Sequence, residues 1–188
     1  MPVDCIITAA GLSSRMGTWK MMLPWREGTL LDASINNALQ FCSRIILVTG
    51  FRGQELQARY QHRENVTLVH NPDYENGLVS SVITGARAVS TDYCFITPGD
   101  LPCLDGEIYR QLWAFRTGGA ILPHYHGTPG HPVLIDRASL QQAISRPAIR
   151  SMRQALMQGK HQHVALDRPE IIVDIDTPDD FRSVQQGS

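Results

Sequence analysis

Residues 5–20 read CIITAAGLSSRMGTWK, and this stretch decides the fold. Its apolar start, residues 5–8, predicts a buried strand that opens into a loop of small residues. Small residues let a ligand approach the backbone closely, and the loop N–H groups together with Arg15 and Lys20 supply the positive field that a polyphosphate needs. The stretch predicts a phosphate-binding loop, against the alternative of an ordinary strand-to-helix loop with solvated charges.

The loop matches neither of two common phosphate motifs. A Walker loop has the form G-x-x-x-x-G-K-[ST], whereas Gly11 and Gly17 are separated by five residues and Lys20 comes two residues late. The dinucleotide pattern G-x-G-x-x-G is also absent, because Ser13 stands where its second glycine would be. The sequence therefore indicates a phosphate loop of another kind.

Apolar runs alternate with helical patterns along the rest of the chain. The predicted strands are residues 5–8, 44–49, 66–70, 92–97, 120–122, 132–135 and 171–173, and the predicted helices are residues 30–41, 54–60, 80–88, 105–115, 138–144, 151–157 and 177–184. This alternation predicts an α/β protein, a three-layer α/β/α sandwich around a mostly parallel sheet. Ligands of such sheets bind beyond the carboxyl ends of the strands, so Gly11, Asp100 and Asp176, each after a predicted strand, are expected at one edge.

The composition bounds the class of protein. The chain has 188 residues, 43% hydrophobic and 19% charged, which predicts one globular domain over residues 1–188. A net charge of −1 does not favour nucleic acid or an anionic membrane as a partner. No run is long and apolar enough to span a membrane, and the first residues lack the pattern of a signal peptide. With Cys5, Cys42 and Cys94 in apolar segments, as expected of buried thiols, the cytoplasm is the expected location.

Five sequence blocks together resemble one family. Gly11, Arg15, Gly17 and Lys20 form a G-x-x-x-R-x-G-x-x-K core, and it is followed by NPDYENGLVSS (71–81), GDLP (99–102), GHP (130–132) and DIDTPDD (174–180). Each block is moderately specific, but all five in this order resemble the nucleotidyltransferases, and within them the molybdenum cofactor cytidylyltransferase group. The resemblance covers essentially the whole chain.

The resemblance implies a fold and a reaction. The fold would be Rossmann-like, of the nucleotide-diphospho-sugar transferase type, with a nucleotide half at about residues 1–100 and an acceptor half at about residues 101–188. The reaction would be Mg²⁺-dependent transfer of CMP from CTP to a phosphorylated molybdopterin-type cofactor, with release of pyrophosphate. Such a transfer crowds negative charge at the α-phosphate, so catalysis depends on positioning and electrostatic stabilisation.

Four residues are predicted to neutralise that negative charge, two directly and two through a bound Mg²⁺ ion. Arg15 and Lys20 would bind the triphosphate, and Lys20, Arg15 and Asp100 form the predicted catalytic set. Asp100 and Asp176 would hold Mg²⁺, which prefers one or two carboxylates with phosphate and water oxygens. Asp100 also suits an ordinary Gly-Asp-x-Pro turn, and Asp176 also suits a helix N-cap, a role that Thr177 could take instead.

The predicted nucleotide-binding residues lie in the first loop and in the block at residues 71–81. They are Ala9, Ala10, Gly11, Ser13, Arg15, Lys20, Gly77, Ser80 and Ser81. Related guanylyltransferases usually carry a glycine pair in this loop, where this chain has Ala9-Ala10-Gly11, so the resemblance favours cytidine over guanosine. Capping of a helix is an equally good role for Ser80 or Ser81 alone.

The acceptor half is less well determined. Gly130 and His131 are the predicted acceptor-binding residues, with a structural histidine as the alternative. Thr128-Pro129 and the segment RPAIRSMR (146–153) depart from the family pattern. The spaced histidine pairs His124/His126 and His161/His163 have no evident third ligand and are expected to be exposed histidines.

Two other functions remain open from the sequence. One is a related nucleotidyltransferase that uses another base or another acceptor, such as a guanylyltransferase or a transferase that acts on a sugar phosphate. The other is a non-catalytic accessory protein that binds the cofactor and delivers it to a molybdenum hydroxylase. The set Arg15, Lys20, Asp100 and Asp176 favours an enzyme, because a carrier does not need all four. The acceptor, the oligomeric state and the protein partner are not determined by the sequence.

Overall fold

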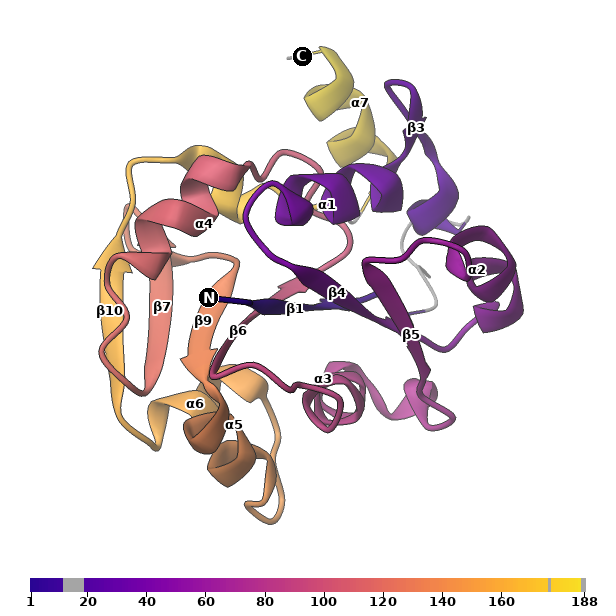
Figure 1. Ribbon diagram of the computed structural model, residues 1–188. Coiled ribbons are helices and arrows are strands. Elements are labelled where there is room, and N and C mark those ends of the chain that lie inside the picture. The colour runs from indigo at the N-terminus through magenta and orange to yellow at the C-terminus, as the bar shows by residue number, and fades with distance from the viewer. Residues whose placement is uncertain (12–18, 176, 187–188) are drawn as a thin grey trace.

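One sheet organises the molecule (Figure 1). The computed structural model describes residues 1–11, 19–175 and 177–186. The sheet runs in the order β10-β7-β9-β6-β1-β4-β5, and β8 pairs with β7. Its strands are β1 (Asp4–Thr8), β4 (Arg44–Thr49), β5 (Val66–His70), β6 (Tyr93–Pro98), β7 (Ala120–Tyr125), β8 (Thr128–Pro129), β9 (Val133–Asp136) and β10 (His161–Ala165). Strand β9 is antiparallel to β6 and β7, β8 is antiparallel to β7, and the remaining pairs are parallel, so the predicted mostly parallel sheet is confirmed.

Helices cover both faces of this sheet (Figure 1). The helices are α1 (Leu30–Leu39), α2 (Gly53–Tyr60), α3 (Leu78–Ala86), α4 (Gly106–Trp113), α5 (Arg137–Ile144), α6 (Met152–Met157) and α7 (Pro178–Gln186). Helices α1, α2 and α4 pack on one face, whereas α3, α5 and α6 pack on the other. A small hairpin of β2 (Pro24–Trp25) and β3 (Gly28–Thr29) precedes α1. The three-layer sandwich is confirmed.

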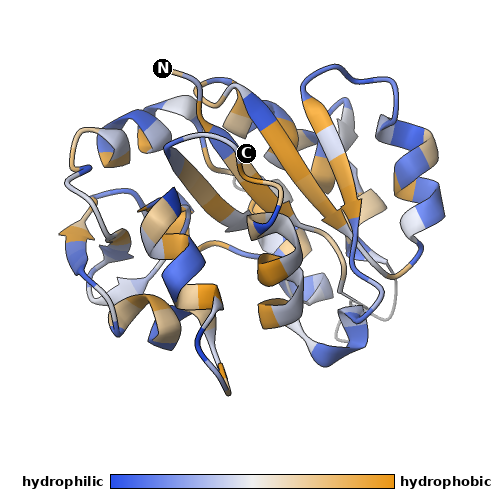
Figure 2. Cartoon of the chain, turned by 60° about the horizontal axis from the view of Figure 1, so that its bottom comes forward, coloured by the Kyte–Doolittle hydropathy of each residue, from blue (hydrophilic) through white to orange (hydrophobic). Residues whose placement is uncertain are grey.

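The alternation of side chains along β1 explains the two cores. Cys5 and Ile7 are fully buried toward α1 and α4, and Ile6 between them is fully buried toward α3. Both faces are apolar because both are covered, as Figure 2 shows in the hydrophobic colouring of the central strands. Helix α3 approaches closely at Gly85, where a Cβ would lie 2.7 Å from the Cγ2 of Ile6.

One predicted strand is wrong and one observed strand was not predicted, and both lie late in the chain. Residues 171–173 were expected to form a strand, but Pro169–Ile172 is a 3-10 helix whose Ile171 is fully buried. The last strand is instead β10, which pairs with β7 at the sheet edge. Its sequence HQHVA has one buried residue, Val164, so an edge strand of polar side chains lacked the apolar signal. The expectation that Asp176 follows a strand is therefore also wrong.

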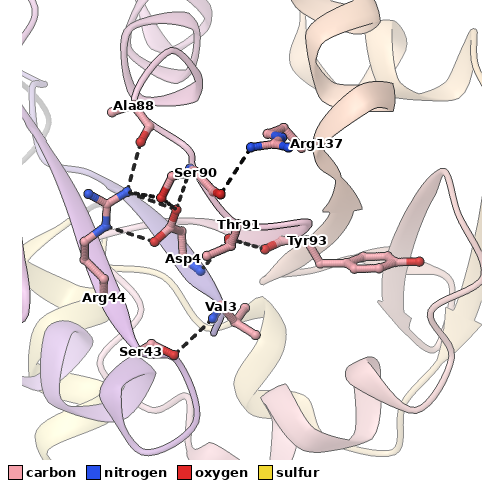
Figure 3. Close-up of polar contacts among 9 residues, drawn as sticks. All are labelled: Val3, Asp4, Ser43, Arg44, Ala88, Ser90, Thr91, Tyr93 and Arg137. Atoms are coloured by element: carbon pink, nitrogen blue, oxygen red, sulfur yellow. Dashed lines mark hydrogen bonds and ion pairs between the residues drawn. The ribbon is translucent and has the colours of Figure 1, made fainter. Parts of the chain in front are cut away.

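A buried carboxylate joins the amino ends of the central strands (Figure 3). Asp4 is 2% exposed and accepts hydrogen bonds from Arg44 Nε at 2.9 Å and from the Ser90 N–H at 2.9 Å. Burial opposes ionisation of Asp4, but the hydrogen bonds from Arg44 and Ser90 outweigh it and lower the pKa of the carboxyl group. This network connects β1, β4 and the loop before β6 at the edge opposite the strand ends that carry the predicted site.

The described helices include none with the length and apolar character that crossing a bilayer requires.

Candidate functional site

A cavity of about 200 Å³ lies beyond the carboxyl ends of β1 and β6. Thr8 and Pro98, the last residues of these parallel strands, stand opposite each other in the sheet and both line it. The full lining is Thr8, Ala10, Gly11, Lys20, Met21, Tyr74, Gly77, Leu78, Ser81, Pro98 and Asp100. We call this the first cavity. It brings together residues 8–11 and 20–21 with residues 74–81 and 98–100, which lie far apart in the sequence.

An ion pair stands in the first cavity. Lys20 Nζ lies 2.8 Å from Asp100 Oδ2, and both side chains are largely buried, at 12% and 10% exposure. Lys20 opens a short 3-10 turn, Lys20–Met22, and Asp100 directly follows β6 and Gly99. The Gly99 N–H donates to the Thr8 carbonyl at 3.0 Å, which fixes the turn before Asp100 against β1. A cation and a carboxylate are thus held side by side where the strands end.

The segment from Asn71 to Ser81 forms the opposite wall. The Asn71 amide donates to Ser80 Oγ at 2.9 Å and to Ser81 Oγ at 3.0 Å, so both hydroxyls are engaged inside the segment. Gly77 has φ of +100°, a conformation that other residues adopt only with strain. Leu78 follows it, begins α3 and is 55% exposed at the cavity wall.

Both described flanks of the first loop are held by one short connection after β4. The Phe51 N–H donates to the Ala10 carbonyl at 3.2 Å. On the far side of residues 12–18, the buried Trp19 ring makes an edge contact with Phe51 at 6.2 Å between ring centroids. The Arg52 guanidinium lies 4.4 Å from the centre of the Trp19 ring. Residues 51 and 52 therefore contact the chain both at Ala10 and at Trp19, which directly precedes Lys20.

A second cavity of about 240 Å³ adjoins the first. The two cavities share Thr8, Leu78 and Pro98. The rest of the second cavity is mostly apolar and is lined by Val82, Ile96, Thr97, Leu122, Pro129, Gly130, His131, Val133, Ser151, Met152, Arg153 and Leu156. The second cavity is therefore lined by residues from both halves of the chain, 8–98 and 122–156, and not by the predicted acceptor half alone.

His131 is the most perturbed titratable group of the second cavity. Burial and the nearby positive charge of Arg153 lower the pKa of His131 from its ordinary 6.5 to about 4. Its Nδ1 atom is buried and has no hydrogen-bond partner among the described residues. Gly130 before it packs so closely that a Cβ would lie 2.7 Å from the Ile171 Cγ1 atom. At neutral pH the His131 ring is uncharged and so brings no positive charge to a phosphate.

The structure gathers most of the predicted site residues. Ala10, Gly11, Lys20, Gly77, Ser81 and Asp100 line the first cavity, and Gly130 and His131 line the second. Ala9 is fully buried in the core, and Ser80 Oγ donates to backbone carbonyls of its own segment. Ser13, Arg15 and Asp176 lie outside the described residues. The backbone N–H of Ile175 donates to the Asp100 carbonyl at 3.0 Å, so the chain just before position 176 runs beside Asp100.

Several lining residues were missed from the sequence. Thr8 and Pro98 could have been found, because Thr8 ends one predicted strand and Pro98 directly follows another at the expected ligand edge. Tyr74 and Leu78 lay within a block already singled out, but nothing local marked them among their neighbours. Arg153 stood in the segment that departs from the family pattern, and only the packing of α6 brings it to a cavity.

The donor set of the first cavity suits a hard divalent cation. The Asp100 carboxylate lies at a strand end beside a cation that could meet phosphate, and Mg²⁺ commonly takes few carboxylates with oxygens of phosphate and water. The described residues include no group of three histidine, cysteine or acidic side chains placed to hold a metal. His124, His161 and His163 are therefore not part of such a group within the described residues.

Comparison with known proteins agrees with this geometry. The profile of the family described as "MobA-like NTP transferase domain" matches residues 5–165. The chain is 59% identical over 184 residues to the molybdenum cofactor cytidylyltransferase of Escherichia coli (strain K12), and the match covers 98% of this chain and 96% of that protein.

Solved structures share the fold. A nucleotidyl transferase from Methanothermobacter thermautotroptrophicus superposes with a TM-score of 0.86 at 21% identity, covering 99% of this chain and 97% of that one. Rv0371c from Mycobacterium tuberculosis H37Rv, solved in complex with manganese, superposes with a TM-score of 0.79 at 20% identity, covering 99% of this chain and 98% of that one.

Proposed function

Because the chain belongs to the MobA-like NTP transferase family, and is thus a nucleotidyltransferase, we propose that it transfers CMP from CTP to a phosphorylated molybdopterin-type cofactor and releases pyrophosphate. The name of the relative at 59% identity supports both the cytidine nucleotide and this acceptor. The four cysteines, which are unpaired thiols, fit a reaction in the reducing cytoplasm. A molybdenum hydroxylase would be the protein that receives the product.

One observation carries the proposal. Two cavities meet at Thr8, Leu78 and Pro98, and the Lys20–Asp100 pair lies in the first of them near that junction. A transfer between two substrates needs adjoining sites, so that an acceptor oxygen can attack the α-phosphorus in line as pyrophosphate leaves on the other side. The first cavity would hold the nucleotide, with Ala10, Gly11, Gly77 and Ser81 as its walls, and the second the acceptor.

The residues divide the work at the junction. Lys20 and Arg15 would meet the charge of the phosphates, and Lys20 would do so most strongly in the transition state. Asp100 and Asp176 would hold Mg²⁺, which when bound would neutralise phosphate oxygens and orient them. Manganese in a protein of the same fold supports the use of a divalent cation. Leu78 and Pro98 would exclude water from the attacking oxygen, because both are apolar and shared by the two cavities.

Base selection is the property that tests the proposal. Ala10 lines the first cavity, where its methyl group narrows the space that a glycine would leave for a purine. We expect CTP to bind at least about tenfold more tightly than GTP, a difference of about 1.4 kcal/mol, and Ala10→Gly to narrow that gap. Isothermal titration calorimetry with Mg²⁺ and each triphosphate measures both. Equal affinities, or a preference for GTP, would contradict a cytidylyltransferase and favour a related transferase.

A turnover assay separates an enzyme for this acceptor from an accessory protein. With CTP, Mg²⁺ and the molybdopterin-type acceptor, we expect acceptor-dependent release of pyrophosphate. Binding of the acceptor without pyrophosphate release under these conditions would support delivery of the cofactor as the function instead.

A further inference from the structure

Arg153 is a cation in a cavity that offers it no carboxylate. It lies on α6, partly buried, and lines the mostly apolar second cavity. Across the described residues, no acidic side chain comes within ion-pair distance of Arg153. Among the described residues, Lys20 of the first cavity pairs with Asp100, and Arg52, which lies over Trp19, pairs with Glu55.

In the part of the chain that the structure describes, the titratable groups whose pKa the charge of Arg153 shifts are histidines. Its positive charge lowers the pKa of both His131 and His163, although burial is the larger cause in each case. With its pKa lowered to about 4, the His131 ring is mostly uncharged at neutral pH, so Arg153 is the main positive charge of the described cavity lining. A guanidinium in apolar surroundings without a counter-ion favours the binding of an anion, and its fork of donors matches phosphate oxygens.

We propose that Arg153 binds the phosphate monoester of the acceptor in the second cavity, while the apolar wall and His131 contact the uncharged body of that molecule. This deepens the function proposed above and rests on it for the identity of the acceptor. The phosphate would then be held between Arg153 and the junction at Thr8, Leu78 and Pro98, which aims its attacking oxygen at the first cavity. The acceptor class is therefore a phosphate monoester on a body with a large apolar face.

The test uses phenyl phosphate, a monoester on an apolar ring, as the probe. It is titrated calorimetrically into the full chain with Mg²⁺ and saturating α,β-methylene-CTP, which fills the nucleotide phosphate sites. We expect Arg153→Gln to weaken phenyl phosphate binding at least about tenfold, and Arg153→Lys to weaken it less, because glutamine loses the charge whereas lysine keeps it without the guanidinium fork. The matched control is Arg150→Gln, which removes an exposed arginine outside the cavity lining and is expected to change nothing.

Three outcomes would overturn the proposal. If Arg150→Gln and Arg153→Gln weakened phenyl phosphate binding equally, the effect would come from the net charge of the protein and not from a site at Arg153. A loss of nucleotide affinity in Arg153→Gln, with phenyl phosphate binding kept, would assign Arg153 to the phosphates of the nucleotide. Equal binding of phenyl phosphate and of uncharged phenol to the wild type would exclude an anion site, and that comparison needs no variant to fold.

The same titrations keep this proposal separate from the proposed function. Failure of the wild type to bind any nucleoside triphosphate would contradict the transferase function. The phenyl phosphate titration, repeated without nucleotide, would still decide whether Arg153 holds a phosphate monoester.

Discussion

At the scale of single residues, Lys20 and Asp100 hold each other in place before substrates arrive. Their 2.8 Å contact is largely buried, so each charge would be costly to leave there without a counter-charge. In the proposed reaction Lys20 exchanges this carboxylate for phosphate oxygens, and Asp100 becomes available to a divalent cation. The pair thus keeps both groups positioned in the cavity.

Lys20→Ala is expected to lower kcat by about 100-fold and to change the KM for CTP much less, since a cation that meets developing charge acts in the transition state. Steady-state kinetics at varied CTP measures the two separately. Lys160→Ala is the control, because Lys160 is exposed and bonds only a loop carbonyl among the contacts described. A raised KM with unchanged kcat would assign Lys20 to ground-state binding.

At the scale of elements, the connection between β4 and α2 contacts Ala10 and Trp19, the described flanks of the first loop. Arg52 has φ of +54°, an uncommon left-handed conformation for a residue other than glycine, and it caps α2 while its guanidinium lies over Trp19. Gly50 before it leaves no room for a side chain, because a Cβ would lie 2.4 Å from the Cβ of Tyr74. Residues 50–52 therefore contact Ala10 and Tyr74 of the first cavity and Trp19 directly before Lys20.

Arg52→Ala is expected to lower kcat/KM for the nucleotide about fivefold, because loss of a cation–π contact worth about 1 kcal/mol loosens Trp19 beside Lys20. Arg116→Ala is the matched control, since Arg116 lies at the same 4.4 Å from the Trp113 ring, away from both cavities. Steady-state measurement of kcat/KM for the nucleotide in both variants tests this prediction. An equal effect of the two variants would show that the stacking is structural and without influence on the site.

Asp4 joins elements at the opposite edge. Asp4→Ala removes the carboxylate that binds Arg44 and Ser90, and we expect the free energy of unfolding to fall by about 3 kcal/mol because a buried ion pair loses one partner. Urea denaturation measures this, with exposed Asp92→Asn as the control. Nucleotide binding at a temperature where the variant stays folded should match the wild type. A large loss of affinity would show that the network reaches the site.

At the scale of the whole molecule, His131 makes stability depend on pH. Its folded pKa is about 4, below the ordinary 6.5, so between these values the unfolded chain binds a proton that the folded chain does not. Stability from this group is therefore present above pH 6.5 and is lost as the pH falls toward 4.

Urea denaturation at pH 7 and pH 5 should show a lower free energy of unfolding at pH 5, and His131→Asn should reduce that difference. The His126→Asn variant is the control, because His126 is exposed on the turn after β7. An unchanged difference in His131→Asn would show that His131 is protonated in the folded protein at pH 5.

The local sequence was enough wherever a pattern repeats at short range. The apolar run of β4 was predicted with its observed bounds, and the last residues of β1 and β6 indicated the ligand edge, because parallel strands end together. Lys20, Gly77 and Asp100 were identified by motif and do line one cavity. Strand β10 was not predicted, because an exposed edge strand needs only one apolar residue, Val164, and its pairing with β7 is a long-range contact.

The sequence alone was sufficient to predict the three-layer fold and to identify Lys20, Gly77 and Asp100 of the first cavity, since side-chain periodicity and short motifs are local features. Only the tertiary structure decided that the two cavities meet at Thr8, Leu78 and Pro98, that His131 is uncharged, and that Arg153 lies beside it. The physical reason is that burial and electrostatic environment depend on which distant segments pack together. The neighbours of Arg153 come from β7, β9 and the segment after β8, and no pattern within α6 records them.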